Sequence, residues 1–465
     1  MALSRTPAAS SHEKVPPEIQ SDIVDAIPSH DDFLSQPESK EFLETLRTCL
    51  FVSPTFRWSA RRHLFEKIHL AGESGLDFHN RLLRLRDLID VSDLGILSCI
   101  RNFVLIPDFG ILCTPQCKEH RAHQVTAAIR EPAIQNMAFI LNMFCHQDAR
   151  LHTLVFHGPS DCGLPTMASE FKRSLLNSMN SSYLTSLKLY HVRSIPKNIL
   201  RGMSITRFTV IESTIDEYED DTYSRHLPLP SLEFVETDSL FLIGILYPVD
   251  HQSSDELEHE SSLNNVWLEI RDENVGTFTM LDISCATFVD QFPSVENLDL
   301  IFRPQDVSEF LSIKPKIDLT RHSALETLTL NYEDADSLLA PTPEARIGLY
   351  TEHIRAIVQA CPDSLQYLTI VLGHAYATPE EILFPHPYPW TALDILLVHD
   401  MFPYFEGVDI RLRCHFPGSY TRKDKDAFMH KAEKAFEKVL PTSNACGMLT
   451  IWVMECSQPC RDCLE

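Results

Sequence analysis

A short apolar phrase that recurs along the chain constrains its fold more than any other feature. The phrase has the form Leu-x-x-Leu-x-Leu, with Ile, Val or Phe at some of the apolar positions. Alternation of apolar and polar residues is typical of a β-strand with one buried face. The seven copies span residues 100–105, 151–156, 184–189, 205–210, 295–300, 325–330 and 365–370. The sequence therefore predicts a series of strands whose leucine-like side chains point inward.

Segments with helical periodicity lie between some of these copies. Residues 167–179 and 344–361 carry apolar side chains at helical spacing, and each segment leads into a strand. A strand-helix unit of this kind exposes an apolar face that stacked neighbours cover. The phrase resembles that of leucine-rich repeats, which run at about 20 to 29 residues. Four of the intervals between the second apolar residues of successive copies are 21 to 40 positions long. The Asn or Cys that usually follows the strand in a leucine-rich repeat is absent.

These features predict an α/β fold in which an irregular leucine-rich-repeat-like solenoid of parallel strands and helices fills most of the chain. We place this domain at residues 71–465, with an insertion around 216–265 and a C-terminal cap around 393–455. Within the cap we expect strands at 393–398, 408–412 and 448–454, and a charged amphipathic helix at 424–440. Such a cap would close the open end of the array. Residues 1–14 are expected to be a disordered tail.

Three apolar stripes predict a helical module at residues 15–70. Two prolines at 16 and 17 fix the entry to the first helix, because proline already has a helical φ and the first amides have no partner to lose. The second stripe contains Leu46 and Leu50, and the third contains Phe56, Ala60 and Leu64. Short amphipathic helices cannot bury their stripes alone, so they pack on one another or on a partner.

The residues of this module resemble the F-box of fungal F-box-like proteins. The match rests on Pro-Pro-Glu-Ile at 16–19, Leu-Arg-Thr-Cys-Leu-Phe-Val-Ser-Pro-Thr-Phe at 46–56 and Ala-Arg-Arg-His-Leu-Phe at 60–65. The resemblance implies a three-helix F-box that binds a Skp-family adaptor, and through it a cullin. The implied adaptor-binding residues are Pro16, Pro17, Ile19, Ile23, Leu50, Val52, Ser53, Phe56, Ala60 and Leu64. In the alternative interpretation, these helices are only the N-terminal cap of the following domain.

The function that the resemblance implies is that of a substrate-recognition subunit of a Skp-cullin-F-box ubiquitin ligase. Such a subunit would bind an unknown protein target through its repeat domain, without being an enzyme and without a cofactor. In line with this, the sequence contains no phosphate-binding, nucleophile-elbow or zinc-protease motif. The alternative is a leucine-rich-repeat scaffold for protein interactions that is not coupled to a ligase.

Charge and composition limit the partners and the compartment. The formal net charge of -25 argues against nucleic-acid binding, which needs clustered Lys and Arg. The densest apolar run, residues 240–249, is too short for the roughly 18 residues of a membrane span. Thirteen scattered cysteines, an odd number, suit a reducing compartment better than a disulfide framework. We therefore expect a cytoplasmic or nuclear protein.

One cluster of soft ligands is a weak candidate for a zinc site. It consists of Cys113, Cys117, His120 and His123, whose close spacing does not match a common zinc finger. The simpler interpretation is a loop with incidental Cys and His, so we predict no metal; a metal-dependent enzyme built around this cluster is the third possible function. The C-terminal cysteines at 456, 460 and 463 supply only three ligands.

Overall fold

The computed structural model of the protein describes residues 40–72, 74–91, 95–112, 126–146, 149–159, 163–196, 198–216, 230–238, 265–271, 295–303, 319–320, 322–333, 343–374, 387–398, 402–414 and 421–455. The predicted tail at 1–14 and the first helix of the N-terminal module lie outside these residues.

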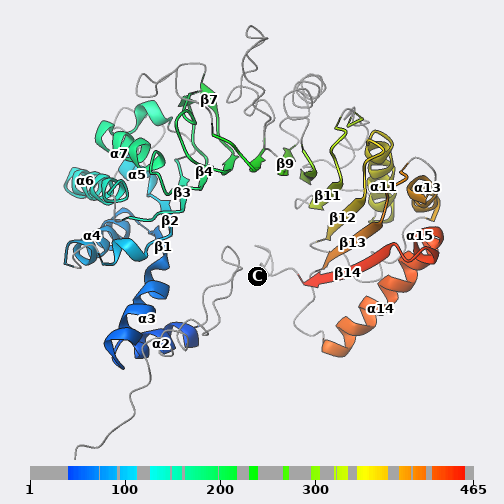
Figure 1. The fold of residues 1–465 in the computed structure, drawn as a ribbon, viewed down its shortest axis with the longest axis horizontal. Helices are drawn as coiled ribbons and strands as arrows, with labels where there is room; N and C mark the ends of the chain where they lie inside the picture. The colour runs from blue at the N-terminus through cyan, green and yellow to red at the C-terminus, as the bar shows by residue number, and fades with distance from the viewer. Residues whose placement is uncertain are drawn as a thin grey trace, which may run out of the picture.

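A single parallel sheet is the framework of the molecule, and its strands follow one another in chain order. Its twelve strands are β1 (Lys67–Ala71), β2 (Asn102–Ile106), β3 (Thr153–His157), β4 (Ser186–Tyr190), β6 (Arg207–Ile211), β8 (Phe234–Thr237), β9 (Asn265–Arg271), β10 (Asn297–Arg303), β11 (Thr327–Glu333), β12 (Tyr367–His374), β13 (Gly407–Cys414) and β14 (Leu449–Glu455). The short strands β5 (Ile195–Pro196) and β7 (Ile215–Asp216) form a separate pair. The large sheet curves into an open arc (Figure 1).

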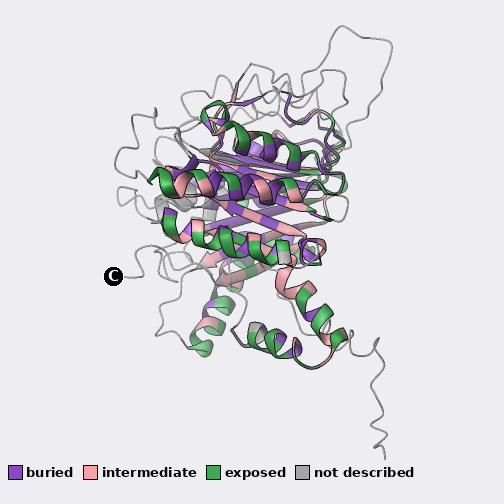
Figure 2. Ribbon diagram, turned by 90° about the vertical axis from the view of Figure 1, so that its left-hand side faces the viewer, coloured by how far each residue is buried: buried purple, intermediate pink, exposed green. Residues whose placement is uncertain are grey.

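Helices cover the outer face of this arc, whereas the inner face carries none among the described residues (Figures 1 and 2). The outer helices are α4 (Gly75–Val91), α5 (Phe109–Leu112), α6 (Ala127–Met143), α7 (Ser169–Met179), α11 (Pro343–Gln359), α13 (Pro387–Val398), α14 (Arg422–Val439) and α15 (Pro441–Ala445). Short 3₁₀ turns, η1 (Leu97–Cys99) and η3 (Leu164–Thr166), complete the connections. The main hydrophobic core lies between the helices and the sheet.

All seven copies of the apolar phrase form parallel strands, as predicted. They correspond to β2, β3, β4, β6, β10, β11 and β12. The three apolar positions of every copy are buried in the main core. The predicted helices at 167–179 and 344–361 are α7 and α11. The alternation therefore located both the strands and their inward faces, because side chains on a strand point alternately to its two sides.

This architecture contradicts the predicted fold class. We expected a three-helix F-box followed by an irregular leucine-rich-repeat-like solenoid. The chain is an α/β protein with two runs of parallel strands, six from β1 to β8 and five from β10 to β14, which β9 joins. Helices of 11 to 18 residues return the chain between strands in Rossmann-like β-α-β units. The apolar phrase is common to any strand buried under a helix layer, so it did not define a leucine-rich repeat.

The C-terminal region differs from its prediction at one element. Residues 393–398 were expected to form a strand but belong to the helix α13. The strand at 408–412, the helix at 424–440 and the strand at 448–454 are confirmed as β13, α14 and β14. Both strands extend the large sheet. Within the predicted insertion at 216–265, β8 also joins that sheet, between β6 and β9.

Among the described residues, no helix is both long and apolar enough to cross a membrane.

Candidate docking site

Two N-terminal helices form a small unit of their own beside the sheet. They are α2 (Lys40–Cys49) and α3 (Pro54–Glu66), which correspond to the second and third helices of the predicted module. Pro54 occupies the first turn of α3, and the Ser53 hydroxyl caps it by accepting a hydrogen bond from the Phe56 amide at 3.2 Å. Both devices satisfy or remove the unpaired amides at a helix start. The turn between the two helices is therefore fixed by local sequence.

The core of this helical pair is separate from the main core. Leu46, Cys49 and Ala60 are buried at its centre, and Leu50, Phe56 and Leu64 pack partly buried around them. Six of the described side chains of the pair take part in this core, which is small for two helices. The pair therefore keeps apolar surface that can contact another part of the chain or a partner protein.

Three large apolar side chains of this pair face solvent. Phe51 is 85% exposed, Val52 60% and Trp58 59%. The guanidinium of Arg62 lies over the Trp58 ring at 5.8 Å, and the Arg57 Nε donates a hydrogen bond to the Leu50 carbonyl at 3.0 Å. This surface combines aromatic and arginine side chains, the types enriched at the centres of protein interfaces. We call Phe51, Val52 and Trp58 the apolar surface of the helical pair.

The structure brings some of the predicted adaptor-binding residues together and leaves others undescribed. Leu50, Phe56, Ala60 and Leu64 share the small core, and Val52 and Ser53 lie in the turn beside it. The other predicted residues, Pro16, Pro17, Ile19 and Ile23, lie outside the described part of the chain. Phe51 and Trp58 were not among the predicted adaptor-binding residues. Trp58 falls between arginines on the polar side of the third stripe, and a lone aromatic there was the available signal.

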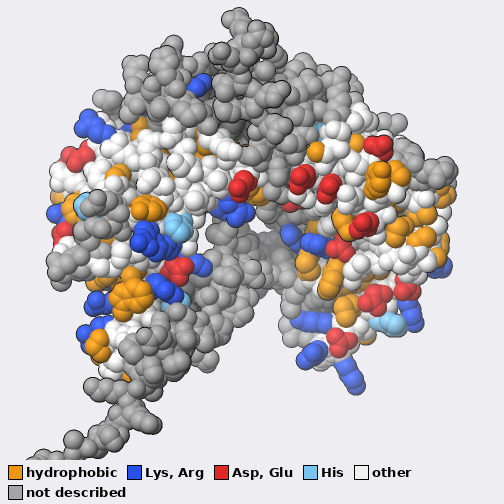
Figure 3. All heavy atoms as spheres, viewed as in Figure 1, with side chains coloured by type: hydrophobic (Ala, Val, Ile, Leu, Met, Phe, Trp, Pro, Cys, Tyr) orange, Lys and Arg blue, Asp and Glu red, His pale blue; other side chains and the backbone are white. Residues whose placement is uncertain are grey.

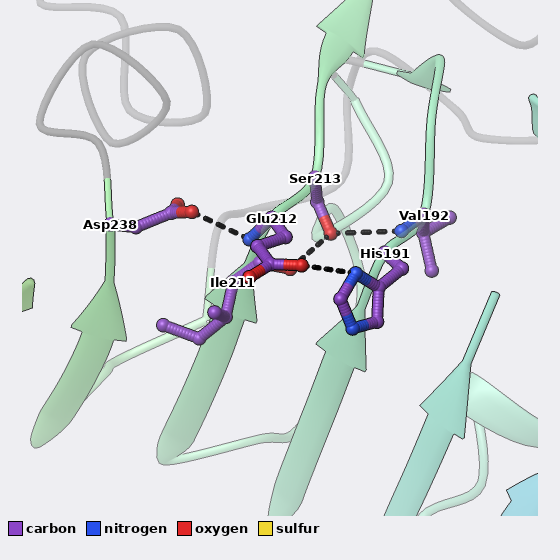
Figure 4. Close-up of polar contacts among 6 residues, drawn as sticks. All are labelled: His191, Val192, Ile211, Glu212, Ser213 and Asp238. Carbon is purple, nitrogen blue, oxygen red and sulfur yellow. Dashed lines mark hydrogen bonds and ion pairs between the residues drawn. The ribbon is translucent and has the colours of Figure 1, made fainter. Parts of the chain in front are cut away.

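A polar cluster lies where β4, β6 and β8 end (Figure 4). The His191 imidazole forms an ion pair with the Glu212 carboxylate, and both residues have left-handed backbone angles, with φ of 55° and 49°. The Glu212 amide donates to Asp238 Oδ2 at 2.6 Å. Ser213 Oγ accepts from the Val192 amide at 3.0 Å and donates to the Ile211 carbonyl at 2.9 Å. These contacts tie the ends of neighbouring strands together.

Burial shapes the acid-base behaviour around this cluster. The His157 ring stacks on Tyr190 with centroids 4.5 Å apart. Burial, together with the nearby His191 and His69, lowers the pKa of His157 to about 4. Burial and then the charge of Glu236 raise the pKa of Tyr190 to about 12. At neutral pH His157 and Tyr190 are therefore both uncharged, and they pack as an aromatic pair. The geometry fits a structural role, in which these contacts hold the strand ends together.

Metal binding has little support in the described part of the chain. No three His, Cys, Asp or Glu side chains there are placed to share a metal ion. The weak zinc candidates Cys113, Cys117, His120 and His123 lie outside the described residues, as do the C-terminal cysteines at 456, 460 and 463.

Comparison with known proteins gives no assignment: no protein-family model matches this chain, and no curated protein matches it at a significant level.

Proposed function

We propose that this chain is the target-recognition subunit of a Skp-cullin-F-box ubiquitin ligase, acting in the cytoplasm or nucleus. The helices α2 and α3 bind a Skp-family adaptor, which links them to a cullin, and the sheet domain binds a protein target. The observation that supports this most is the apolar surface of the helical pair, which lies on a unit with its own small core. Exposed apolar side chains gathered on one small unit are typical of protein-interaction sites.

The connection between the helical pair and the sheet supports a mechanism based on proximity. The last residue of α3, Glu66, is followed directly by Lys67 of β1, so no linker separates docking helix and sheet. The Arg101 amide also donates to the Glu66 carbonyl at 2.8 Å. A target bound to the sheet is then held at a fixed distance from the adaptor. The chain raises the local concentration of a target lysine near the activated ubiquitin and performs no bond chemistry itself.

The charge of α3 also fits an acidic adaptor. Arg57, Arg61 and Arg62 lie on this helix, within a chain whose formal net charge is -25. A basic patch of this kind speeds encounter with an acidic partner and makes the association rate depend on ionic strength. The patch lies beside the exposed Trp58, so steering and apolar contact act at the same surface.

Co-purification of the full-length chain with a Skp-family adaptor tests this proposal. We expect the wild-type chain to form the complex and the double variant Val52→Asp with Trp58→Asp to bind at least about tenfold more weakly, because hot-spot truncations cost roughly 2 kcal/mol or more. Both residues are exposed, so the fold should persist in circular dichroism. The matched control is Tyr183→Asp with Tyr404→Asp, two exposed aromatic residues elsewhere on the molecule. Full adaptor binding by the Val52/Trp58 variant would rule out this docking surface.

A protein-interaction scaffold without a ligase is the second candidate. It is favoured by the packing of Phe65, at the end of α3, against the main core, which is what an N-terminal cap would do. In that case the wild-type chain does not bind the adaptor at all, whereas the apolar surface still affects solubility.

A further inference from the structure

A cavity opens on the helix-free face of the sheet, where β6, β8, β9 and β10 begin. Its volume is about 380 Å³, within the range of small-ligand pockets. The lining residues are Arg207, Glu233, Phe234, Val266, Asn297 and Asp299. The Arg207 guanidinium lies 4.9 Å from the Phe234 ring centroid, so it is held against one wall. Among the described lining residues, two carboxylates against one guanidinium give a net negative charge.

Asp299 is the more enclosed of the two carboxylates. It lies in the middle of β10, partly buried, with a side-chain hydrogen bond to Thr329 on the next strand. Burial raises the pKa of Asp299 above its usual value, while Thr329 and the charge of Arg411 lower it in part. A carboxylate that has lost water in this way gains more from a cation than an exposed one does.

A row of glutamates continues from the cavity along the same edge of the sheet. Glu233, Glu296, Glu326 and Glu406 each immediately precede a strand, namely β8, β10, β11 and β13. The parallel register aligns them, and the Glu326 amide donates to the Glu296 carbonyl at 2.9 Å. All four side chains are exposed. In Figure 3 acidic side chains lie along the inner curve of the arc, with Lys and Arg side chains beside them. We call these four residues the acidic margin.

Some carboxylates on this side of the sheet have a hydrogen-bond or ion-pair partner, and others have none among the described residues. The Tyr367 hydroxyl donates to Glu406, and Arg411 pairs with the nearby Asp409 at 3.1 Å. Within the described part of the chain, the carboxylates of Glu296 and Glu326 have no ion pair or hydrogen bond. They lie on neighbouring strands, which are about 4.8 Å apart in a sheet. Two like charges at this spacing repel each other unless a cation lies between them.

We infer that the cavity and the acidic margin together bind a segment of the target protein that is rich in Lys and Arg. One cationic side chain enters the cavity beside Asp299 and Glu233, and further cations of the segment lie along Glu296 and Glu326. Lys and Arg suit the site because long apolar stems can cover Phe234 while the charged ends reach the carboxylates. The polyanionic backbone of a nucleic acid would be repelled. This inference rests on the proposed function, since it names the class of target that the sheet domain holds.

Peptide binding to the purified full-length chain tests the inference. The probe is a fluorescein-labelled 12-residue peptide with Lys or Arg at alternate positions, measured by fluorescence anisotropy, beside a peptide with Glu at the same positions. We expect the basic peptide alone to bind. The variant Glu296→Gln with Glu326→Gln should weaken its binding about tenfold, and Asp299→Asn should do so as well.

The matched control removes the same charge elsewhere. Asp426→Asn with Glu437→Gln changes two exposed acids on α14, on the helix side of the molecule, and should leave peptide binding within twofold of wild type. Equal weakening by margin and control variants would mean that only net charge matters and would overturn the site. Binding of the acidic peptide, or no change in the margin variant, would overturn it too.

Adaptor co-purification separates failure of this site from failure of the proposed function. The margin variant should keep the adaptor, and the Val52→Asp with Trp58→Asp variant should keep the peptide. If the chain binds the basic peptide but no adaptor, the peptide site stands and the proposed ligase function is refuted. If the chain binds the adaptor but not the basic peptide, the ligase function stands and the peptide site is refuted.

Discussion

The buried pair of Tyr332 and His353 makes the stability of this protein depend on pH. The Tyr332 hydroxyl lies 2.7 Å from His353 Nδ1, and Phe302 stacks on the Tyr332 ring at 4.9 Å. Burial lowers the pKa of His353 to about 3. In the unfolded chain this pKa returns to about 6.5, so between these values the unfolded state binds the additional proton. The contribution of His353 to stability is therefore complete above pH 6.5 and is lost as the pH falls toward 3.

We predict that the free energy of unfolding falls between pH 7.5 and pH 5, and that His353→Gln reduces this fall by about 2 kcal/mol. Burial also lowers the pKa of His322 to about 4, so His322 adds to the fall in the wild type and in the variant alike. Urea titrations at the two pH values measure the difference. An identical pH dependence in wild type and variant would show that His353 has the same pKa in the folded and the unfolded chain.

Asp394 caps the N-terminus of α15, which lies far from it in the sequence. Its side chain is 1% exposed and accepts hydrogen bonds from the Thr442 amide at 2.8 Å, the Ser443 amide at 2.8 Å and the Ser443 hydroxyl at 2.6 Å. These are donors at the start of α15 that would otherwise lack a partner.

We predict that Asp394→Ala lowers the free energy of unfolding by about 3 kcal/mol, since it leaves buried donors unsatisfied. Asp394→Asn retains an acceptor oxygen and should cost less. Urea unfolding of the two variants at neutral pH compares them, with the exposed Asp363→Ala as the control. If alanine and asparagine cost the same, these hydrogen bonds do not stabilise the fold.

At the scale of elements, the junction between β1 and α4 depends on a close approach of the backbone. A Cβ at Gly72 would lie 2.5 Å from the Phe78 amide nitrogen, which is backbone and cannot rotate away. Gly407, at the start of β13, has room: the nearest atom to a Cβ there would be the Met448 carbonyl oxygen, at 3.4 Å. The two glycines therefore have different roles, although both lie at strand ends.

We predict that Gly72→Ala lowers the free energy of unfolding by about 2 kcal/mol, because β1 and α4 must move apart, and that Gly407→Ala changes it by less than about 1 kcal/mol. Thermal unfolding followed by circular dichroism compares the two. Equal melting temperatures would mean that the β1–α4 junction relaxes without cost.

The sequence predicted helix or strand correctly where the apolar periodicity was clear. The prediction was wrong where the periodicity was ambiguous. The helix α14 has an apolar stripe and a capping box between Thr421 and Asp424, and the sequence located it. The segment 393–398 is apolar at nearly every position, which suits a buried strand and a buried helix equally. The prolines before it, Pro387 and Pro389, lie in the first turn of α13, where proline is tolerated.

At the scale of the whole molecule, the helical pair and the sheet domain differ in how much core supports them. The main core runs continuously from Leu70 to Leu440, whereas the core of α2 and α3 is a separate group centred on Leu46 and Ala60. Local opening costs less where fewer apolar contacts must break. We therefore expect the helical pair to open locally more readily than the rest of the described structure.

We predict that amides of α2 and α3 exchange with deuterium at least about tenfold faster than those of α6 and α7 in the isolated chain, since about 1.4 kcal/mol of local stability corresponds to a factor of ten. Hydrogen exchange with mass spectrometry measures both regions in one experiment. Addition of a Skp-family adaptor should slow only α2 and α3. Equally slow exchange in both regions would show that the helical pair is part of the main cooperative unit.

The sequence by itself determined where most of the strands lie and which of their side chains point inward, because alternation and helical periodicity are local properties of the chain. It also located the helical pair and most residues of its small core. Only the tertiary structure decided that the strands join in one open parallel sheet with helices on one face. It alone also placed Phe51 and Trp58 in solvent, and Asp394 against Ser443. Burial and exposure depend on neighbours distant in sequence, and a pattern of residue types along the chain does not specify those neighbours.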